Sequence, residues 1–231
     1  TDAALLSIIG FPAFAVVDPQ LVARTRTKIV EKLEGKYGCK RFLRDGHQTI
    51  LEDTTRLHYE PEELLKFEGI ECEWPLFFTY LYLDALFSGD VAGIEKYRDL
   101  LANVAIDLDG TQLLPELYYV PKSKIAAERS QPHSQTRLPN ENLPLVWAQS
   151  LYFLGALLFD RFLAPGDLDP LGRHLEIGNK RRRTVQIALI AEDEDLQAQL
   201  AEYGIDTQIP AQIEPIQVRQ STELAAAYTQ I

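Results

Sequence analysis

The sequence predicts a mainly α-helical protein with a small α/β domain at its C-terminal end, and the distribution of apolar residues carries the helical part of that prediction. Residues 76–87 and 144–158 have the pattern of helices that are apolar nearly all round, and residues 90–104 between them have the pattern of an amphipathic helix. A helix without a polar face must be surrounded by other elements, whereas an amphipathic helix can face water on one side. This alternation is expected of two concentric rings of helices, with the apolar helices in the inner ring.

Composition sets the broad class of the chain and of its partners. Of the 231 residues, 46% are hydrophobic, which is enough for a folded core, and the formal net charge is −11. An acidic surface repels phosphate backbones, so we expect no nucleic-acid partner, and the composition suits a neutral ligand such as a sugar. The chain contains no methionine, which favours a fragment of a longer protein.

The two cysteines, Cys39 and Cys72, lie far apart and form no CxxC motif. Their spacing argues against a disulfide framework or a zinc site and indicates a reducing compartment, so we expect a cytoplasmic protein. The sequence has no apolar run of about 18 residues, and its first residues lack the pattern of a signal peptide. We therefore expect no association with a membrane.

Start and stop signals define the first long helix. Asp18 and Pro19 have the order of a helix N-cap followed by proline at the first helical position, and Gly35 ends the helix. Residues 36–70 are rich in charges and are expected to be irregular.

Start and stop signals also define the two helices that follow. Pro75 opens the apolar helix, and Glu71 and Glu73 are expected at its positive N-terminal end. The helix ends before Gly89, and Asp90 caps the amphipathic helix. The apolar face of that second helix consists of Ile94, Tyr97, Leu101 and Val104.

A loop is predicted from residue 107 to about residue 141, and Pro144 opens another helix after it. One face of this helix consists of Trp147, Leu151, Leu154 and Leu158. Its other faces are also largely apolar, so we expect it to be buried on all sides.

The character of the chain changes at residues 165–167. A β-type run covers residues 185–191, and residues 193–203 are predicted to form a helix that Gly204 ends. A second strand at 213–218 and a short helix at 224–228 complete a β-α-β unit with a trailing helix. We therefore predict two domains, residues 1–163 and residues 164–231.

The sequence offers one candidate metal site, and it is incomplete. Four positions of a calcium-binding EF-hand loop are matched by Asp107, Asp109, Gly110 and Glu116. The first ligand position is Ala105, which has no side-chain oxygen, and Pro115 stands where the exit helix would begin. No P-loop, GxGxxG, GxSxG or HExxH motif is present, so we expect no metal and no cofactor.

Three segments resemble the glucoamylases, glycoside hydrolase family fifteen. They are Lys40-Arg41-Phe42-Leu43-Arg44-Asp45, Glu73-Trp74-Pro75-Leu76 and Leu114-Pro115-Glu116-Leu117-Tyr118, the last preceding a helix with Trp147 near its start. The resemblance implies the C-terminal half of an (α/α)6 barrel for residues 1–163. It also implies that Glu116 is the general base, that Arg41 and Asp45 bind the terminal glucose, and that Trp74 stacks on a sugar.

A second likeness, to the α and β regulatory subunits of phosphorylase kinase, extends over nearly the whole chain. It is carried by Cys72-Glu73-Trp74-Pro75, Pro132-His133, Trp147-Ala148-Gln149-Ser150-Leu151-Tyr152, Asp169-Pro170-Leu171, Val185-Gln186-Ile187 and Pro215-Ile216-Gln217-Val218. This resemblance implies a regulatory subunit of glycogen metabolism that includes the α/β tail.

Plainer interpretations of the four site residues stay open. Glu116 could be a loop or helix-capping residue, Arg41 an ion-paired surface residue, and Asp45 part of an ordinary Asp-Gly turn. A tryptophan that opens a buried helix, such as Trp74, is more often a core residue than a ligand platform.

Three functions compete at this point. The first is binding or inverting hydrolysis of an α-glucan by a longer parent protein, the second a non-catalytic regulatory subunit, and the third a helical scaffold without a sugar site. Inverting hydrolysis needs two carboxyl groups, and in the resembling family the general acid precedes the segment that residue 1 matches. We therefore expect the isolated chain to be inactive. The expected partners are an α-glucan or oligosaccharide and either the missing N-terminal half or another protein subunit.

Overall fold

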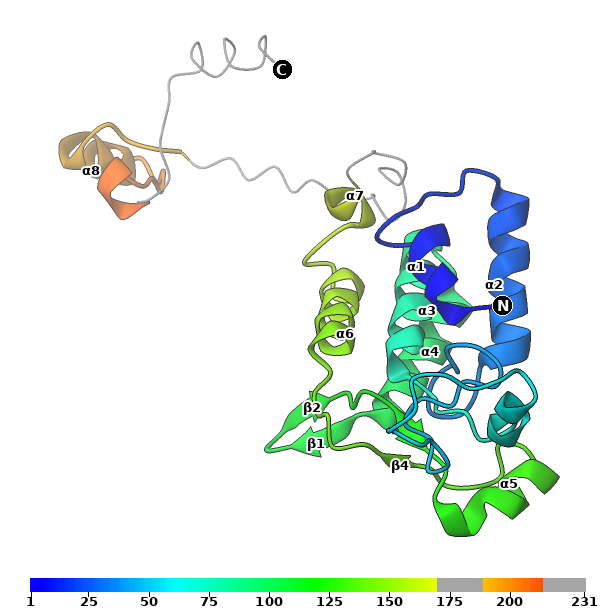
Figure 1. Ribbon diagram of the computed structural model, residues 1–231. Coiled ribbons are helices and arrows are strands. Elements are labelled where there is room, and N and C mark those ends of the chain that lie inside the picture. Colours follow the sequence, from blue (N-terminus) through cyan, green and yellow to red (C-terminus); the bar gives the residue numbers. More distant parts are fainter. Residues whose placement is uncertain (170–188, 214–231) are drawn as a thin grey trace. The chain divides into compact units, whose positions relative to one another are not determined.

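A computed structural model describes residues 1–169 and 189–213 of the chain (Figure 1). The chain forms two compact units, Thr1–Lys180 and Arg181–Ile231. Helices dominate the described part of the first unit, as predicted from the sequence. No helix within the described ranges is both long enough and apolar enough to cross a membrane.

The first unit contains seven α-helices among its described residues, together with short 3-10 turns. The helices are α1 (Leu6–Ile9), α2 (Pro19–Leu33), α3 (Pro75–Ser88), α4 (Val91–Val104), α5 (Ile125–Ser130), α6 (Val146–Phe159) and α7 (Pro165–Leu168). The 3-10 turns are Ala3–Leu5, Glu63–Phe67 and Lys122–Lys124. Two antiparallel pairs complete the unit: β1 (Ile106–Leu108) with β2 (Thr111–Leu113), and β3 (Tyr118–Tyr119) with β4 (Leu138–Pro139).

The predicted boundaries of α2, α3 and α4 are confirmed and have local causes, whereas α6 begins at Val146, two residues after the predicted Pro144. The Asp18 carboxylate accepts hydrogen bonds from the backbone N–H groups of Gln20 and Leu21, and Asp90 does the same for Gly93. Helix α3 ends at Gly89, whose φ of 69° is left-handed. These caps satisfy N–H groups that the first turn of a helix leaves without partners.

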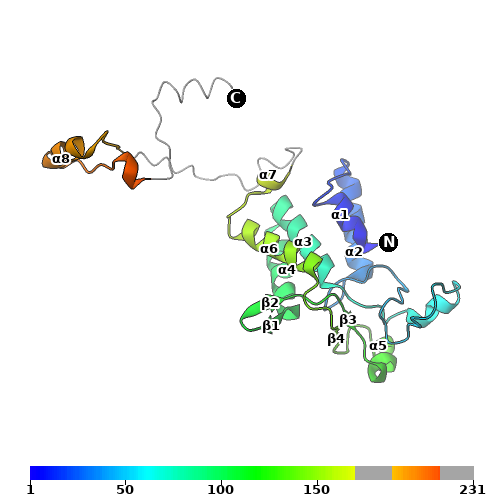
Figure 2. The same ribbon diagram turned by 60° about the vertical axis from the view of Figure 1, so that its left-hand side comes forward.

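Helix α3 is the centre of the first unit. It packs against α4 and α6, and α1 lies on its other side, away from α6 (Figures 1 and 2). Eleven of its 14 residues are buried, among them Phe78 and Leu83 at 0% exposure. The prediction that this apolar helix is enclosed by others is confirmed.

Helix α4 has the predicted amphipathic character. Tyr97, Leu101 and Val104 are buried, and Ile94 packs against the core at partial exposure. The charged residues of the helix cover its other face, so α4 lies between α3 and solvent.

Helix α6 departs from the prediction of burial on all sides. Ala148, Leu151 and Leu158 face α3, but a second side carries exposed apolar residues. That side contains Val146 (74% exposed), Trp147 (55%), Phe153 (50%) and Leu157 (42%). The expectation was wrong because nothing within the described residues covers this face.

The prediction that residues 107–141 form a loop is also wrong in part, because this part of the chain contains β1 to β4 and α5. Asp107, Asp109 and Gly110 form the turn of the β1–β2 hairpin: the Asp107 carboxylate accepts from the Gly110 N–H at 3.1 Å, and Asp109 and Gly110 have φ of 52° and 81°. Asp107 and Asp109, two of the three acidic residues that match an EF-hand loop, are therefore explained by the hairpin.

The second unit confirms one predicted element. Helix α8 (Glu194–Glu202) begins after Asp193, whose carboxylate accepts from the Leu196 N–H at 2.8 Å. Ile190 forms a parallel bridge with Gln208, and a 3-10 turn covers Pro210–Gln212. Most of the predicted strands at 185–191 and 213–218, and the helix at 224–228, lie outside the described residues, so the β-α-β unit stays a prediction.

The predicted domain boundary between residues 163 and 164 also stays a prediction. Helix α7 lies in the first unit, where Leu168 packs against the core and Asp169 is 5% exposed.

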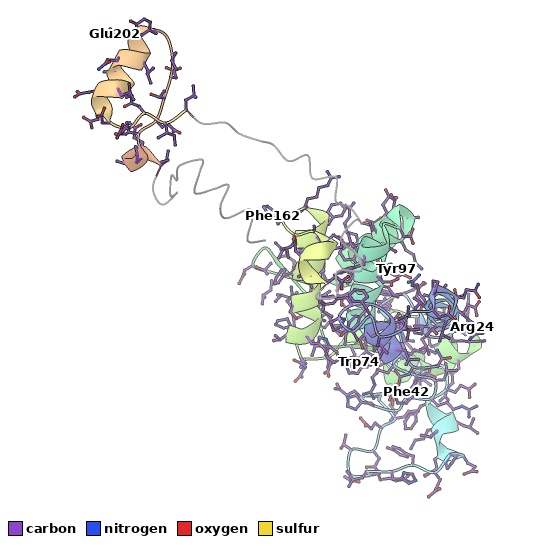
Figure 3. The ribbon with its side chains drawn as sticks, turned by 90° about the horizontal axis from the view of Figure 1, so that it is seen from above. Arg24, Phe42, Trp74, Tyr97, Phe162 and Glu202 are labelled. Atoms are coloured by element: carbon purple, nitrogen blue, oxygen red, sulfur yellow. The ribbon has the colours of Figure 1, made fainter. Side chains whose placement is uncertain are left out.

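Removal of a core ring should destabilise the chain far more than removal of an exposed one. Phe78→Ala in α3 is expected to lower the free energy of unfolding by about 3–5 kcal/mol, because it leaves a cavity in a closed core. Phe162→Ala is the matched control, since Phe162 is 72% exposed and lies at the margin of the unit (Figure 3), and should change it by less than about 0.5 kcal/mol. Urea unfolding followed by circular dichroism measures both. Equal effects would contradict the central position of α3.

Stability should fall at alkaline pH because several tyrosines are buried, among them Tyr82 and Tyr118. Burial raises the pKa of Tyr82 and of Tyr118 to about 12, from an ordinary value of about 10. Above pH 10 the unfolded chain releases these protons while the folded chain keeps them, so stability is full below pH 10 and is lost as pH rises toward 12. Unfolding midpoints measured from pH 8 to pH 11 should decrease above pH 10, and less steeply in Tyr118→Phe. A midpoint that stays constant over this range would contradict the assignment.

Candidate functional site

The loop after α2 brings Arg41 and Asp45 together. The Arg41 guanidinium forms a two-pronged ion pair with the Asp45 carboxylate, Nε to Oδ2 at 2.6 Å and NH2 to Oδ1 at 2.8 Å. Asp45 is 4% exposed, and its Oδ1 also accepts from the His47 N–H at 3.1 Å. A bidentate pair of this kind fixes the direction of both side chains.

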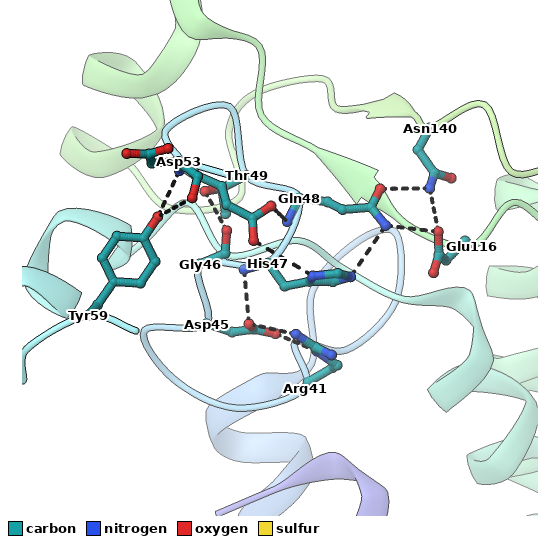
Figure 4. A network of polar contacts seen from close by, with 11 residues as sticks. Arg41, Asp45, Gly46, His47, Gln48, Thr49, Asp53, Tyr59, Glu116 and Asn140 are labelled. Atoms are coloured by element: carbon teal, nitrogen blue, oxygen red, sulfur yellow. Dashed lines mark hydrogen bonds and ion pairs between the residues drawn. The ribbon is translucent and has the colours of Figure 1, made fainter. Parts of the chain in front are cut away.

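Glu116 lies beside this loop, although it is far away in sequence. Its Oε2 accepts from Gln48 Nε2 at 3.0 Å and from Asn140 Nδ2 at 2.7 Å, and Asn140 Nδ2 also lies 3.0 Å from Gln48 Oε1. Gln48 Nε2 is 3.3 Å from the His47 ring. Arg41, Asp45, His47, Gln48, Glu116 and Asn140 thus form one chain of contacts, which we call the polar network (Figure 4).

The backbone around Glu116 is held on both sides. The Glu116 N–H donates to the Asn142 carbonyl at 3.0 Å, and the Asn140 N–H donates to the Leu117 carbonyl at 3.0 Å. Glu116 is half-buried, and its Oε1 receives no hydrogen bond from the residues that the structure describes. One carboxylate oxygen is therefore fixed by amides while the other can accept a hydrogen bond from a ligand.

Trp74 supports the network and does not present an open ring. It is 7% exposed, with the Arg41 guanidinium carbon 5.1 Å from its ring centroid and the His47 ring stacked at 6.0 Å and 17°. Its indole Nε1 is buried and has no hydrogen-bond partner among the described residues. In this structure the predicted sugar platform is largely covered by two members of the network.

Two buried carboxylates hold the loops of the site. Glu71 accepts from the Arg44 N–H at 2.8 Å and pairs with Lys40 at 2.8 Å, while Glu73 accepts from the Tyr37 N–H at 2.8 Å. Both are 0% exposed. They do not cap the first turn of α3, as the sequence suggested, because their oxygens are used by the loop between α2 and α3.

Arg137 balances the negative charge of Glu73. Its NH2 lies 3.0 Å from Glu73 Oε1 and 3.2 Å from Glu128 Oε1, and its NH1 donates to the Glu71 carbonyl at 2.6 Å. Arg137 is 3% exposed, so this is a buried charge network whose members depend on one another.

Two glycines allow the loop to approach these groups. A Cβ on Gly35 would lie 2.1 Å from the Glu73 carboxylate, and one on Gly38, whose φ is 154°, would lie 2.2 Å from the Trp74 backbone. Any larger residue would push the loop away from the start of α3.

The four residues predicted from the sequence are therefore neighbours. Arg41 and Asp45 are paired, Trp74 lies against Arg41, and Glu116 joins them through Gln48. Gln48, Asn140 and Arg137 were not predicted, because an amide or arginine in a loop has no spacing pattern that marks it.

A cavity of about 410 Å³ opens near the site but has different walls. It is lined by Lys40, Leu43, Glu68, Gly69, Glu71, Glu128, Arg129, Pro132, His133 and Arg137. None of the four predicted site residues is among them.

Comparison with known proteins assigns the family. The model of "Glycosyl hydrolases family 15" matches residues 3–201, so the chain belongs to this family. The match continues past residue 163, where the likeness to glucoamylases was expected to stop.

The chain is also similar to proteins that carry a regulatory name. It is 48% identical over all 231 residues to the phosphorylase b kinase regulatory subunit alpha, skeletal muscle isoform, of Mus musculus, and 48% identical to the liver isoform of Takifugu rubripes. A probable subunit of the same name from Caenorhabditis elegans is 48% identical over 218 residues. The chain spans only 19% of the length of the mouse protein. A solved glycosidase variant is 22% identical, with a TM-score of 0.44, and the match covers 69% of this chain and 36% of that one.

Loss of the Asp45 carboxylate should destabilise the loop. Asp45→Ala leaves the Arg41 guanidinium and the His47 N–H without their acceptor, so we expect the free energy of unfolding to fall by about 1–3 kcal/mol. Asp99→Ala, at an exposed position on α4, is the control and should have almost no effect. Chemical denaturation measures the difference, and an unchanged midpoint for Asp45→Ala would show that the ion pair is not formed.

Proposed function

We propose that this chain binds a glucose residue of an α-glucan without hydrolysing it, as part of a regulatory subunit of glycogen metabolism. The observation that carries the proposal is the polar network. It joins side chains from three separate segments beside a half-buried carboxylate with a free oxygen.

The chemistry of the network suits a sugar. Glu116 Oε1 and the Asp45 carboxylate can accept hydrogen bonds from hydroxyl groups, and Arg41 NH1, which makes no hydrogen bond to the described residues, can donate to ring and hydroxyl oxygens. A few directed polar groups of this kind fix the orientation of a small neutral ligand. The Trp74 ring contacts the Arg41 guanidinium and holds it in place. It has this role instead of the stacking on a sugar that was expected from the sequence.

Binding without hydrolysis follows from how the carboxylates are used. Inverting hydrolysis needs a carboxylic acid and a carboxylate roughly 6.5–9.5 Å apart on opposite sides of the bond. Asp45 is held on both oxygens by Arg41 and therefore acts as an acceptor, not as a proton donor. Of the two carboxylates in the network, only Glu116 has an oxygen available to accept a proton as a general base would.

The regulatory role rests on the relatives. Proteins named as regulatory subunits are 48% identical over all 231 residues of the chain, including the tail. We infer that the parent protein works with other protein subunits and that the first unit forms part of an (α/α)6 barrel, with α3 in its inner ring. The exposed apolar face of α6 would then be covered by further barrel helices or by another subunit.

A second candidate function is hydrolysis of an α-glucan by the full-length parent. The family match favours it, as does Glu116, whose Oε1 is free to activate water. It requires a general acid from outside the described residues.

Ligand binding can be tested by thermal unfolding with acarbose or maltotriose. A ligand that binds only the folded chain stabilises it, by about 2.7 kcal/mol at a hundredfold excess over Kd, so Tm should rise by several degrees. Glu116→Gln and Arg41→Ala should each remove most of this shift. Glu141→Gln and Arg24→Ala, at exposed positions, are the matched controls and should keep it.

The same samples separate the competing functions. We expect no glucose release from maltotriose by the chain, and robust release would establish the hydrolase instead. No change of Tm with any ligand would leave a helical scaffold without a sugar site.

A further inference from the structure

The cavity of about 410 Å³ beside the polar network has its own structural support. The Glu128 carboxylate accepts from the N–H groups of His133 and Gln135, each at 3.0 Å, and pairs with Arg137 at 3.2 Å. His133 has a left-handed φ of 62°, a conformation that these contacts stabilise. The wall formed by residues 128–137 is thus fixed before any ligand arrives.

The opposite wall is fixed in the same way. Glu71, which has no exposed surface, binds Lys40 at 2.8 Å and the Arg44 N–H at 2.8 Å. Arg137 ties the two walls together through the Glu71 carbonyl. A cavity whose polar walls are already ordered loses little conformational entropy on binding.

Charge and polarity define the class of ligand. Three cations line the cavity and three carboxylates balance them, so the formal charge of its walls is zero with His133 neutral. The cations are Lys40, Arg129 and Arg137, and the carboxylates are Glu68, Glu71 and Glu128. Balanced walls, in a chain of net charge −11, favour neither an anion nor a cation.

The groups that remain available suit hydroxyl groups. Arg129 is exposed, and among the described residues its guanidinium makes one hydrogen bond, to the Lys66 carbonyl, which leaves other N–H donors available to a ligand. Leu43 and Pro132 add apolar surface to the same cavity, which can pack on the C–H face of a sugar ring. We propose that this cavity is a second binding site, for a neutral polyhydroxylated ligand of the glycosyl class.

The second site shares a loop with the first but no side chain. Lys40 and Leu43 line the cavity, whereas Arg41 and Asp45, in the same loop, belong to the polar network. The two sites can therefore be removed separately, and neither depends on whether the other binds sugar.

Amide chemical shifts of the ¹⁵N-labelled chain during titration with maltotriose test the second site. The His133 and Gln135 amides report on the cavity, and the His47 and Gln48 amides report on the network. Both pairs should shift in the unmodified chain. Leu43→Trp, which fills the cavity, should weaken the response at His133 and Gln135 at least tenfold and leave the other pair unchanged. Glu116→Gln should have the opposite effect.

Matched controls distinguish loss of binding in the cavity from a general loss of folded structure. Leu57→Trp places the same ring at a fully exposed position and should change neither response. If Leu43→Trp does not fold, Arg129→Ala replaces it, with Arg24→Ala as its control.

Each remaining outcome overturns a defined part of the proposal. Unchanged His133 and Gln135 shifts in the unmodified chain, or shifts that survive both cavity variants, would rule out the second site. Equal shifts with inorganic phosphate would show that the cavity does not select a neutral ligand over an anion and would overturn the assigned ligand class. Loss of the response at His47 and Gln48 alone would contradict the first site and leave the second intact.

Discussion

Two carboxylates without access to solvent, those of Glu71 and Glu73, hold the loops of the first unit around the start of α3. Buried charges are costly unless they are paired and hydrogen-bonded, and each of these finds partners only when distant segments come together. Glu71 binds the loop at Lys40 and Arg44, and Glu73 binds the Tyr37 N–H and, with its backbone, Tyr118. The placement of the site depends on this arrangement.

This arrangement has two consequences. The loop presents Arg41 and Asp45 to the segment that carries Glu116, which gives the polar network (Figure 4). Residues of the same loop and of the segment around Glu128 line the cavity.

Local signals made the helices predictable, since caps and apolar periodicity act within a few residues. Asp18 and Asp90 start helices where expected, and Tyr97 faces the core as its spacing implied. The resemblance to glucoamylases predicted that Arg41, Asp45 and Glu116 belong to one site. Sequence could not show that Trp74 would be covered, because that depends on where Arg41 and His47 come to lie. The exposed face of α6 was missed for a similar reason: apolar periodicity says which surfaces avoid water but not what covers them.

We propose that the loops anchored by Glu71 and Glu73 form a site for one glucose residue at Arg41, Asp45 and Glu116. A crystal structure of the chain with maltotriose bound tests it most directly. The account predicts a sugar ring within hydrogen-bonding distance of Glu116 Oε1 and of Arg41 or Asp45, with Gln48 and Asn140 still on Oε2. A ring that contacts none of these three residues, while they bind only one another, would contradict it.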